Sequence, residues 1–309
     1  MWIRNLLLGT FFLGMAAATG GCSAGDCGSF AEAACAKISE CQPYFSGLIA
    51  TSTTTNCVSL ERDLCQRALT APGSNNTPEQ AGRCGDVYKK SACDDLFSGA
   101  LSSAADCQPA GSRLTGEPCA QDSQCQSAHC QIASGNCGTC QPTAGAGQAC
   151  GGTGKIACAS GLSCVNSVCV SYGSVGHACS ASAPCQNNLR CVSNTCQPKV
   201  DPGGPCTTSN DCKTYLGNQV CDTATKLCTT VTINYIDGGG SCSNTVKNNM
   251  LNVCKADFDC VSPATGGAAT CIPRTALGQP CGAAGQASCA LGSSCISNTC
   301  QIVDPASCG

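Results

Sequence analysis

The sequence predicts a small disulfide-rich fold: an N-terminal α-helical bundle stapled by disulfides, followed by tandem short β-hairpin cysteine-rich modules. Two observations carry this prediction. The chain has 35 cysteines in 309 residues, about 11 %, which is beyond the level that marks a disulfide scaffold. Only 4 % of its residues are aromatic and 36 are glycines, so the chain lacks the side chains to fill one large core. Several small modules, each held by its own bridges, are expected instead.

The same composition bounds compartment and partners. A reducing cytosol would leave these thiols free, so we expect maturation in a periplasm, at a cell surface or outside the cell. The net charge of −3 and the isoelectric point near 5.3 supply no basic stripe. No nucleic-acid partner is therefore predicted.

Residues 1–21 have the order of a secretory signal, with one positive charge, an apolar run and then small residues. The stretch 6–21 is 16 residues long, short of the roughly 20 that cross a bilayer. Thr19-Gly20-Gly21-Cys22 resembles a bacterial lipobox, which would make Cys22 a lipid anchor. Setting Cys22 aside leaves 34 of the 35 cysteines, enough for 17 disulfides. Cleavage after Ala18, leaving Cys22 as a free thiol, is the alternative.

The segment 27–107 is predicted to be a small helical domain with four disulfides. Composition or apolar spacing marks helices at 30–41 and 58–69. A third helix should begin at Thr77-Pro78, with Gln80 completing a capping box, and run to about Phe97. Eight cysteines allow 105 pairings, so the connectivity stays open. These cysteines are Cys27, Cys35, Cys41, Cys57, Cys65, Cys84, Cys93 and Cys107.

After a linker at residues 109–116, a cysteine repeat fills the chain up to residue 300. Each repeat opens with a glycine three residues before its first cysteine, and the starts lie 27 to 39 residues apart. The tandem four-cysteine repeats proper are placed at 176–300, after a larger module at 116–169. The first cysteines are Cys119, Cys150, Cys179, Cys206, Cys242 and Cys281.

The most regular repeat endings, 164–169, 191–196 and 295–300, each predict a β-hairpin with a two-residue turn. In this register the third and fourth cysteines of a unit lie opposite each other and point to one face. Both can then reach the segment with the first two cysteines, which favours first-to-third and second-to-fourth pairing. Each bridge would close a loop of roughly a dozen residues, worth about 3 kcal/mol in the chain-entropy model.

One further strand is predicted at residues 231–236, VTINYI, within the longer loops of the fourth and fifth repeats. Packing between units is its expected role. The alternative is an exposed contact surface.

The cysteine order from 119 to 169 resembles the Dickkopf N-terminal cysteine-rich domain. The matching cysteines are Cys119, Cys125, Cys130, Cys137, Cys140, Cys150, Cys158, Cys164 and Cys169. The family pattern has ten cysteines with an adjacent pair, so this stretch lacks one partner. Cys308, in the tail 301–309, is predicted to fold back and pair with the odd thiol. The structural cysteines continue in the next repeat with Cys179, Cys185, Cys191 and Cys196.

This resemblance implies a secreted modulator of Wnt signalling. The helical head, the repeats and the lipobox-like signal together resemble surface lipoproteins of myxobacteria and related Gram-negative bacteria. That second resemblance implies an outer-membrane or cell-surface location, with the Dickkopf-like module serving as a structural part.

Candidate chemical sites are few. His129 with Cys137 and Cys140 offers zinc-ligand types, and CGTC at 137–140 has the spacing of a thiol oxidoreductase motif, but disulfides are the expected use of both cysteines. Asp257, Asp259 and Asn210-Asp211 fall short of a calcium loop and are expected to be solvated loop residues. Neither a nucleophile elbow nor a phosphate-binding loop is present in the sequence. No catalytic residue, cofactor or metal is therefore predicted.

These observations predict a non-catalytic secreted or outer-membrane-anchored protein that binds, adheres or supports structure at the surface. We expect a protease-resistant rod, with an extracellular protein or glycan as partner and the membrane engaged through the lipid. A protease inhibitor presenting Lys213-Thr214-Tyr215 is one alternative. A secreted signalling modulator of the Dickkopf type is another.

Overall fold

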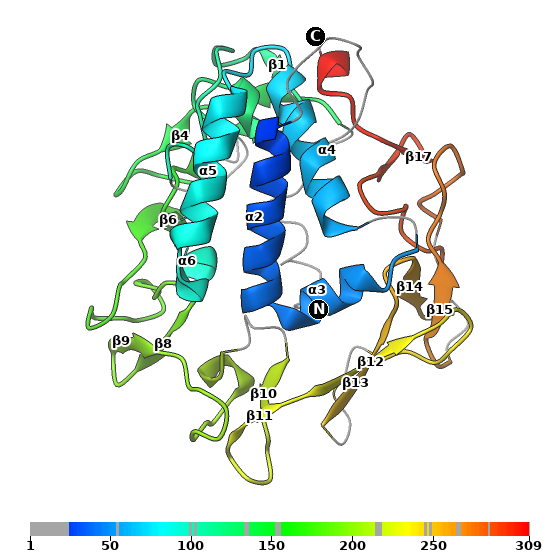
Figure 1. Cartoon of the computed structure of the whole chain (residues 1–309). Helices are drawn as coiled ribbons and strands as arrows, with labels where there is room; N and C mark the ends of the chain where they lie inside the picture. Colours follow the sequence, from blue (N-terminus) through cyan, green and yellow to red (C-terminus); the bar gives the residue numbers. More distant parts are fainter. Residues whose placement is uncertain are drawn as a thin grey trace.

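The computed structural model describes residues 25–53, 56–98, 101, 104–132, 136–151, 156–213, 218–243, 246, 249–263, 267–283 and 285–308. The N-terminal part is a helical head in which α2 lies between α4 and α5 (Figure 1). Small side chains allow this close packing: Ala31, Ala33 and Ala34 of α2 are buried, and Gly85 of α5 lies against the backbone of Phe30. The helices are α2 (Gly25–Cys41), α3 (Pro43–Ala50), α4 (Cys57–Thr70), α5 (Pro78–Lys90) and α6 (Cys93–Ser98).

Four disulfides staple the head, as predicted. Cys27–Cys65 and Cys35–Cys57 join α2 to α4. On each helix the two cysteines are eight residues apart, a little over two turns, so they share a face and form two rungs of an antiparallel ladder. Cys41–Cys93 ties α2 to α6, and Cys84–Cys107 ties α5 to the segment that leaves the head.

The third predicted helix begins where expected, but its capping box and its end are wrong. Thr77 is the N-cap and accepts a hydrogen bond from the Gln80 backbone N–H (3.2 Å). The Gln80 side chain, however, does not complete a capping box, because its amide donates to the Ala105 carbonyl (3.3 Å). The helix also ends at Lys90 rather than near Phe97, since Ser91 has extended backbone and α6 starts afresh at Cys93.

Six cysteine units follow, at 119–140, 150–169, 179–196, 206–228, 242–271 and 281–300, each with four cysteines except the first, which has a fifth, Cys137. The stretch expected to be one larger module, 116–169, therefore contains two units. The strands are β1 (Pro118–Cys119), β2 (Cys130–Gln131), β3 (Gly138–Cys140), β4 (Thr143–Ala144), β5 (Ala157–Cys158), β6 (Leu162–Val165), β7 (Val168–Ser171), β8 (Leu189–Val192), β9 (Thr195–Pro198), β10 (Gln219–Cys221), β11 (Cys228–Thr230), β12 (Thr232–Ile236), β13 (Met250–Cys254), β14 (Phe258–Val261), β15 (Thr270–Pro273), β16 (Ser294–Ile296) and β17 (Thr299–Gln301).

The glycine that opens each unit is the third residue of a β-turn. Its φ lies between +76° and +89° in all six units, which is the left-handed region that a type II turn requires at this position. In every unit its N–H donates to the carbonyl of the last cysteine at 2.8 Å; in the third unit, for example, Gly176 bonds Cys196. The repeated glycine therefore locks the start of each unit onto its end.

The predicted hairpins are confirmed. Cys191 lies opposite Cys196 across β8 and β9, and both turn residues, Ser193 and Asn194, have positive φ, as a type I′ turn requires. The hairpins β6–β7 and β16–β17 have the same register and turn geometry. Since hairpin geometry brings the last two cysteines to one face, each can bond a different cysteine of the preceding loop.

The units curve into a ring around the head. In each unit the residue six positions before the first cysteine pairs in parallel with the second cysteine, as Gly173 does with Cys185. The joint between two units is the segment that follows the last cysteine of one unit and ends at this pairing residue of the next. It is four residues long at four of the five joints and eight residues long before the fifth unit. Joints of one length repeat the same rotation, which produces a steady curvature.

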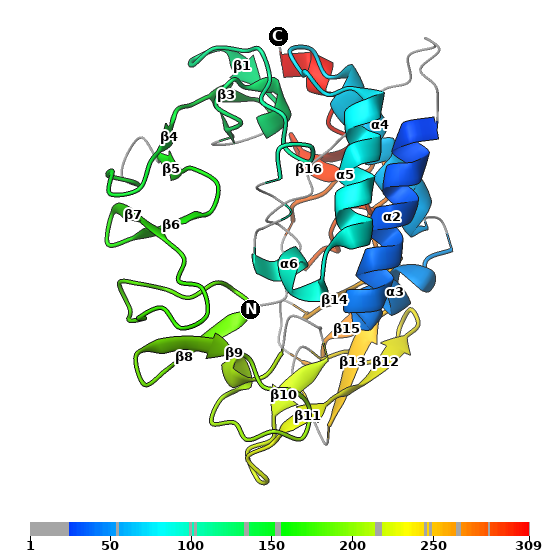
Figure 2. The ribbon, with the colours of Figure 1, turned by 60° about the vertical axis from the view of Figure 1, so that its left-hand side comes forward.

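Both views show the result: the units run down one side of the head, beneath it and up the other, until the C-terminal helix η4 (Pro305–Cys308) lies beside β1 (Figures 1 and 2). The expectation of a rod is wrong, because the array returns to its own beginning. The linker predicted at 109–116 is also part of this structure, since the N–H groups of Gly111 and Arg113 bond the Cys125 and Gln124 carbonyls. No helix within the described residues is long and apolar enough to cross a membrane.

Candidate functional site

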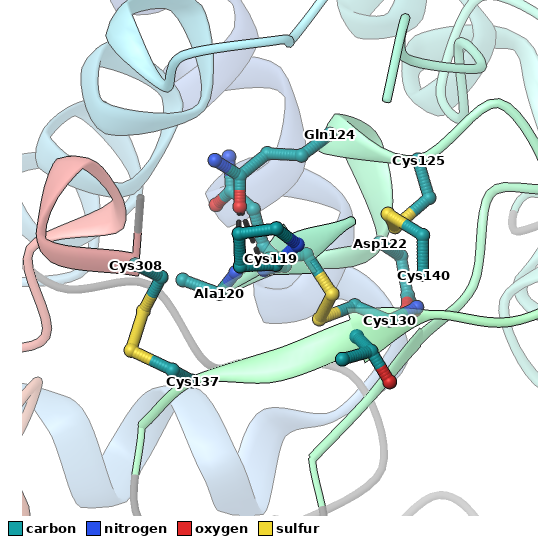
Figure 3. Close-up of a disulfide and its surroundings, with 12 residues drawn as sticks. Cys119, Ala120, Asp122, Gln124, Cys125, Cys130, Cys137, Cys140 and Cys308 are labelled. Carbon is teal, nitrogen blue, oxygen red and sulfur yellow. Dashed lines mark hydrogen bonds between the residues drawn. A yellow bond between two sulfur atoms is a disulfide. The ribbon is translucent and has the colours of Figure 1, made fainter. Parts of the chain in front are cut away.

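The ring closes at a junction of three segments: the loop at 71–76 that follows α4, the first unit, and η4. Figure 3 shows Cys308 of η4 bonded to Cys137, beside Gln124 and Ala120 of the first unit. The bridge spans 171 residues of sequence, whereas the other described bridges span 11 to 52. This junction is the place where the two ends of the array meet and are joined.

Gln124 is the centre of the junction and is fully buried. Its Oε1 accepts from the N–H groups of Ala120 (2.7 Å) and Gln121 (3.1 Å). Its Nε2 donates to the carbonyls of Pro72 (2.8 Å) and Pro305 (3.4 Å). One side-chain amide thus satisfies backbone groups from all three segments, which a buried polar group must do to avoid a desolvation cost.

Gln124 is held in place by its local structure. It is the last residue of the 3₁₀ turn η1 (Asp122–Gln124) and immediately precedes Cys125, which is bonded to Cys140. Arg113 completes the junction by donating from its guanidinium to the carbonyls of Pro118 and Cys308, the latter at 3.2 Å. The array is therefore closed by one covalent bond and a small set of hydrogen bonds.

Every predicted structural cysteine that the structure describes is in a disulfide. In the second to sixth units the pairing is first-to-third and second-to-fourth, as predicted. The first unit keeps this pattern once its extra cysteine, Cys137, is set aside, and Cys137 is the odd thiol that Cys308 bonds. The bridges of the first three units are Cys119–Cys130, Cys125–Cys140, Cys150–Cys164, Cys158–Cys169, Cys179–Cys191 and Cys185–Cys196. Those of the last three are Cys206–Cys221, Cys212–Cys228, Cys242–Cys260, Cys254–Cys271, Cys281–Cys295 and Cys289–Cys300. Cys22 lies outside the described residues.

This pairing decides two chemical alternatives. The cysteines of the CGTC motif bond Cys308 and Cys125 rather than each other, so the motif does not form the internal bridge of a thiol oxidoreductase. Triads of sulfur atoms such as Cys119, Cys125 and Cys140 lie within 4.8 Å of one another, as metal ligands would. Each of these sulfurs is bonded in a disulfide, however, and a cysteine binds zinc as a thiolate.

The predicted strand at 231–236 packs against the head. It forms β12, which pairs in parallel with β13, and its Tyr235 hydroxyl donates to the Tyr44 carbonyl (2.9 Å). The Tyr235 ring also lies so close to Gly47 of α3 that a side chain at position 47 would clash with the Tyr235 hydroxyl. Packing rather than an exposed contact surface is therefore the role of this strand.

Asp257 is a second fastening between ring and head, which corrects the expectation of a solvated loop acid. Its carboxylate accepts from the Ser52 hydroxyl (2.6 Å) and from both the N–H and the hydroxyl of Thr53 (2.7 Å each). Nearby, the Ala256 N–H donates to the Thr51 hydroxyl (2.9 Å). The loop after α3 is thus bound to the fifth unit by four hydrogen bonds.

Asp259 and Asp211 are also structural, again contrary to expectation. Partial burial raises the pKa of Asp259, but hydrogen bonds from Ser288 and the charge of Arg274 outweigh it and leave the pKa lowered. For Asp211, burial again raises the pKa, while hydrogen bonds from Thr207 and Thr208 and the charge of Arg190 lower it to about 2. Both carboxylates are occupied by their own surroundings rather than directed at a calcium ion.

The joint between the third and fourth units contains an open depression of about 400 Å³, where Arg190 and Asp211 lie 3.5 Å apart. This ion pair links the third unit to the fourth across the depression. The loop proposed to face a protease begins at Lys213, whose ammonium pairs with Asp201 (2.7 Å). Thr214 and Tyr215 lie outside the described residues.

A buried acid occurs in the head, unanticipated from the sequence. Glu61 of α4 is 6 % exposed, and this burial raises its pKa to about 7. Burial, followed by the charge of Glu61, also raises the pKa of Tyr88 to about 12. Glu61 is therefore a group whose charge changes near neutral pH inside the helical core.

No family model, curated protein or solved structure matches the chain. The likeness to the Dickkopf N-terminal domain therefore rests on the order of cysteines alone.

Sequence reasoning missed Gln124 and Arg113, although one signal was present. In the first and fourth units a polar residue, Gln124 or Asp211, stands immediately before the second cysteine. Its side chain binds the backbone N–H groups that follow the first cysteine.

Proposed function

We propose that the protein is a non-catalytic, disulfide-locked surface protein that is exported and held to a membrane through a lipid on Cys22. The observation that carries this proposal is the fully paired cysteine set: all 34 cysteines from Cys27 to Cys308 form 17 disulfides. Leaving Cys22 alone is what a lipid-modified N-terminal cysteine requires, and 17 bridges require an oxidising compartment.

The construction of the folded part supports a binding or structural role. The described acids that drew attention in the sequence are occupied by hydrogen bonds within the protein, and the repeated residues hold the backbone. Residues that vary between units lie in the loops of a rigid, bridged frame, where side-chain changes cost little stability. An extracellular protein or glycan is the partner that such a surface suits.

Anchoring is tested by intact mass and fractionation. Wild-type protein is expected to begin at Cys22, to carry a diacyl or triacyl addition, and to have a mass about 34 Da lower than the reduced chain because 17 disulfides remove 34 hydrogens. It should remain with membranes, and Cys22→Ser should be released in soluble, fully bridged form. A soluble wild-type protein cleaved after Ala18 would overturn the anchor and leave the secreted scaffold.

The surface role is tested with the same pair of strains. Cells that display the wild-type protein are expected to adhere to extracellular protein or glycan surfaces more than cells expressing Cys22→Ser at equal level. Adhesion that is equal in the two strains would contradict a role at the cell surface.

A further inference from the structure

The bridge between Cys137 and Cys308 differs from the others in what it connects. The remaining described bridges lie inside the head or inside one unit. This bridge joins the first unit to the last four described residues of the chain, η4. It also has one accessible side, since Cys137 is exposed while Cys308 is only 3 % exposed.

The non-covalent attachment of η4 is slight. A four-residue 3₁₀ helix has no stability of its own. Apart from contacts of the bridge's own sulfur atoms with the Ser307 and Asn136 carbonyls, its described hydrogen bonds to the first unit and the segment before it come from Gln124 to the Pro305 carbonyl, at the long distance of 3.4 Å, and from Arg113 to the Cys308 carbonyl at 3.2 Å. Once the disulfide is cut, the tail is held against the first unit only by these few hydrogen bonds and by the packing of the buried Pro305 beside β1.

Other bridges with an exposed sulfur are held differently. Cys191 is exposed, but its partner Cys179 is fixed to the same hairpin by a hydrogen bond to the Asn194 carbonyl (2.9 Å), and Cys185–Cys196 clamps the same unit. A thiol pair released there stays in position and closes again. An exposed sulfur is therefore not enough for a cleaved bridge to stay open. The two segments that it joins must also have few other contacts with each other.

We propose that Cys137–Cys308 is a redox latch: a dithiol cleaves it selectively, and the cleavage opens the ring at the junction while the head remains fastened to the fifth unit through Asp257. A thiolate of the dithiol attacks the exposed Cys137 sulfur, the S–S bond breaks, and Cys308 leaves as a thiolate that takes up a proton. The second thiol of the dithiol then attacks the first sulfur of the same dithiol in the mixed disulfide, and Cys137 leaves as a thiolate that takes up a proton. The dithiol is oxidised by two electrons and the bridge is reduced to two thiols.

The natural reductant belongs to the class of dithiol oxidoreductases, and the probe for the test is dithiothreitol. Opening exposes the buried junction face around Ala120 and Gln124 and frees the C-terminal segment. The latch thereby offers a second, reduction-dependent surface on a protein that is otherwise held rigid.

The first experiment treats the full oxidised protein with limiting dithiothreitol, traps thiols by alkylation and maps them by mass spectrometry over time. Cys137–Cys308 is expected to be lost at least ten-fold faster than Cys179–Cys191, whose Cys191 sulfur is also exposed. Equal rates for the two bridges would overturn the selectivity.

The second experiment measures hydrogen exchange at the tail. The Ser307 N–H, which bonds the Asp304 carbonyl (3.0 Å), is expected to lose at least ten-fold of its protection in the Cys137→Ser/Cys308→Ser double variant. The matched Cys179→Ser/Cys191→Ser variant, which removes a bridge inside one unit, should leave that amide protected. Unchanged protection in the first variant, or in wild type after selective cleavage, would show that the tail stays docked and that the bridge is not a latch.

Discussion

The glycine that opens each unit gives the sharpest test of how the repeat is held together. In the second unit, Gly147 has φ of +77°, and no atom lies within 4 Å of the position that a Cβ would take. A Gly147→Ala change therefore meets no steric obstacle from neighbours. Its cost is the conformational penalty of placing an L-residue in the left-handed region, about 1–2 kcal/mol.

Part of this penalty is offset in the unfolded chain, because alanine has fewer conformations to lose and gains about 0.4–1 kcal/mol. The net destabilisation of the turn should be about 1 kcal/mol, which corresponds to roughly a five-fold loss of protection. The amides to follow by hydrogen exchange are Gly147, whose N–H donates to the Cys169 carbonyl (2.8 Å), and Cys169, whose N–H donates to the Gln148 carbonyl (2.8 Å).

The same turn contains a matched control. Gly145 accepts the turn hydrogen bond from Gln148 (3.1 Å), has equally open surroundings and is not in the left-handed region. Gly145→Ala should therefore be neutral or stabilise by about 0.5 kcal/mol through the unfolded chain. If both substitutions changed protection equally, positive φ would not be the reason for the repeated glycine.

Three further substitutions test the junctions and the head. Asp257→Ala removes an acceptor of three hydrogen bonds from the loop after α3 and should weaken docking of the fifth unit by about 2 kcal/mol, seen as faster exchange of the Thr53 N–H. The control Asp237→Ala removes an exposed ion pair with Lys255 and should change the docking free energy by less than about 0.5 kcal/mol. Gln124→Ala should cost about 2 kcal/mol at the junction by leaving buried backbone groups unpaired, measured by exchange of the Ala120 N–H, while the exposed Gln126→Ala should have no effect. For Glu61, burial raises the folded pKa to about 7 from 4.5, so the folded state binds the extra proton and stability falls as pH rises between these values, by about 3 kcal/mol in total. Glu61→Gln should make guanidinium unfolding of the head, followed by circular dichroism at 222 nm, nearly independent of pH over that interval, and a pH dependence that persists unchanged would assign it to another group.

The parts predictable from sequence were those set by neighbouring residues. Two polar residues between Val192 and Thr195 allow only a tight hairpin, and strand alternation then places Cys191 and Cys196 on one face. The pairing inside each unit follows from that geometry. In the same way, Thr77 before Pro78 located the start of α5.

Helix ends were harder to predict, because a tertiary bond decided them. Residues 78–97 have helical character throughout, yet the chain leaves the helix at Ser91 and begins α6 at Cys93, which is bonded to Cys41 of α2. The Asp95 carboxylate accepts from the Ala92 N–H (2.7 Å) and stabilises the new start. Local propensity cannot anticipate where a distant partner will be.

The difference between a rod and a ring has the same origin on a larger scale. Cysteine spacing describes each unit but not the rotation from one unit to the next, which depends on the joint, four residues long in four of five cases, and on its parallel pairing. The odd number of cysteines in the stretch 119–169 predicted that Cys308 must return to it, and the return is possible only if the array curves. The unpaired thiol was therefore the one feature of the sequence that required a closed ring, because a straight array of six units would place Cys308 at the opposite end from Cys137.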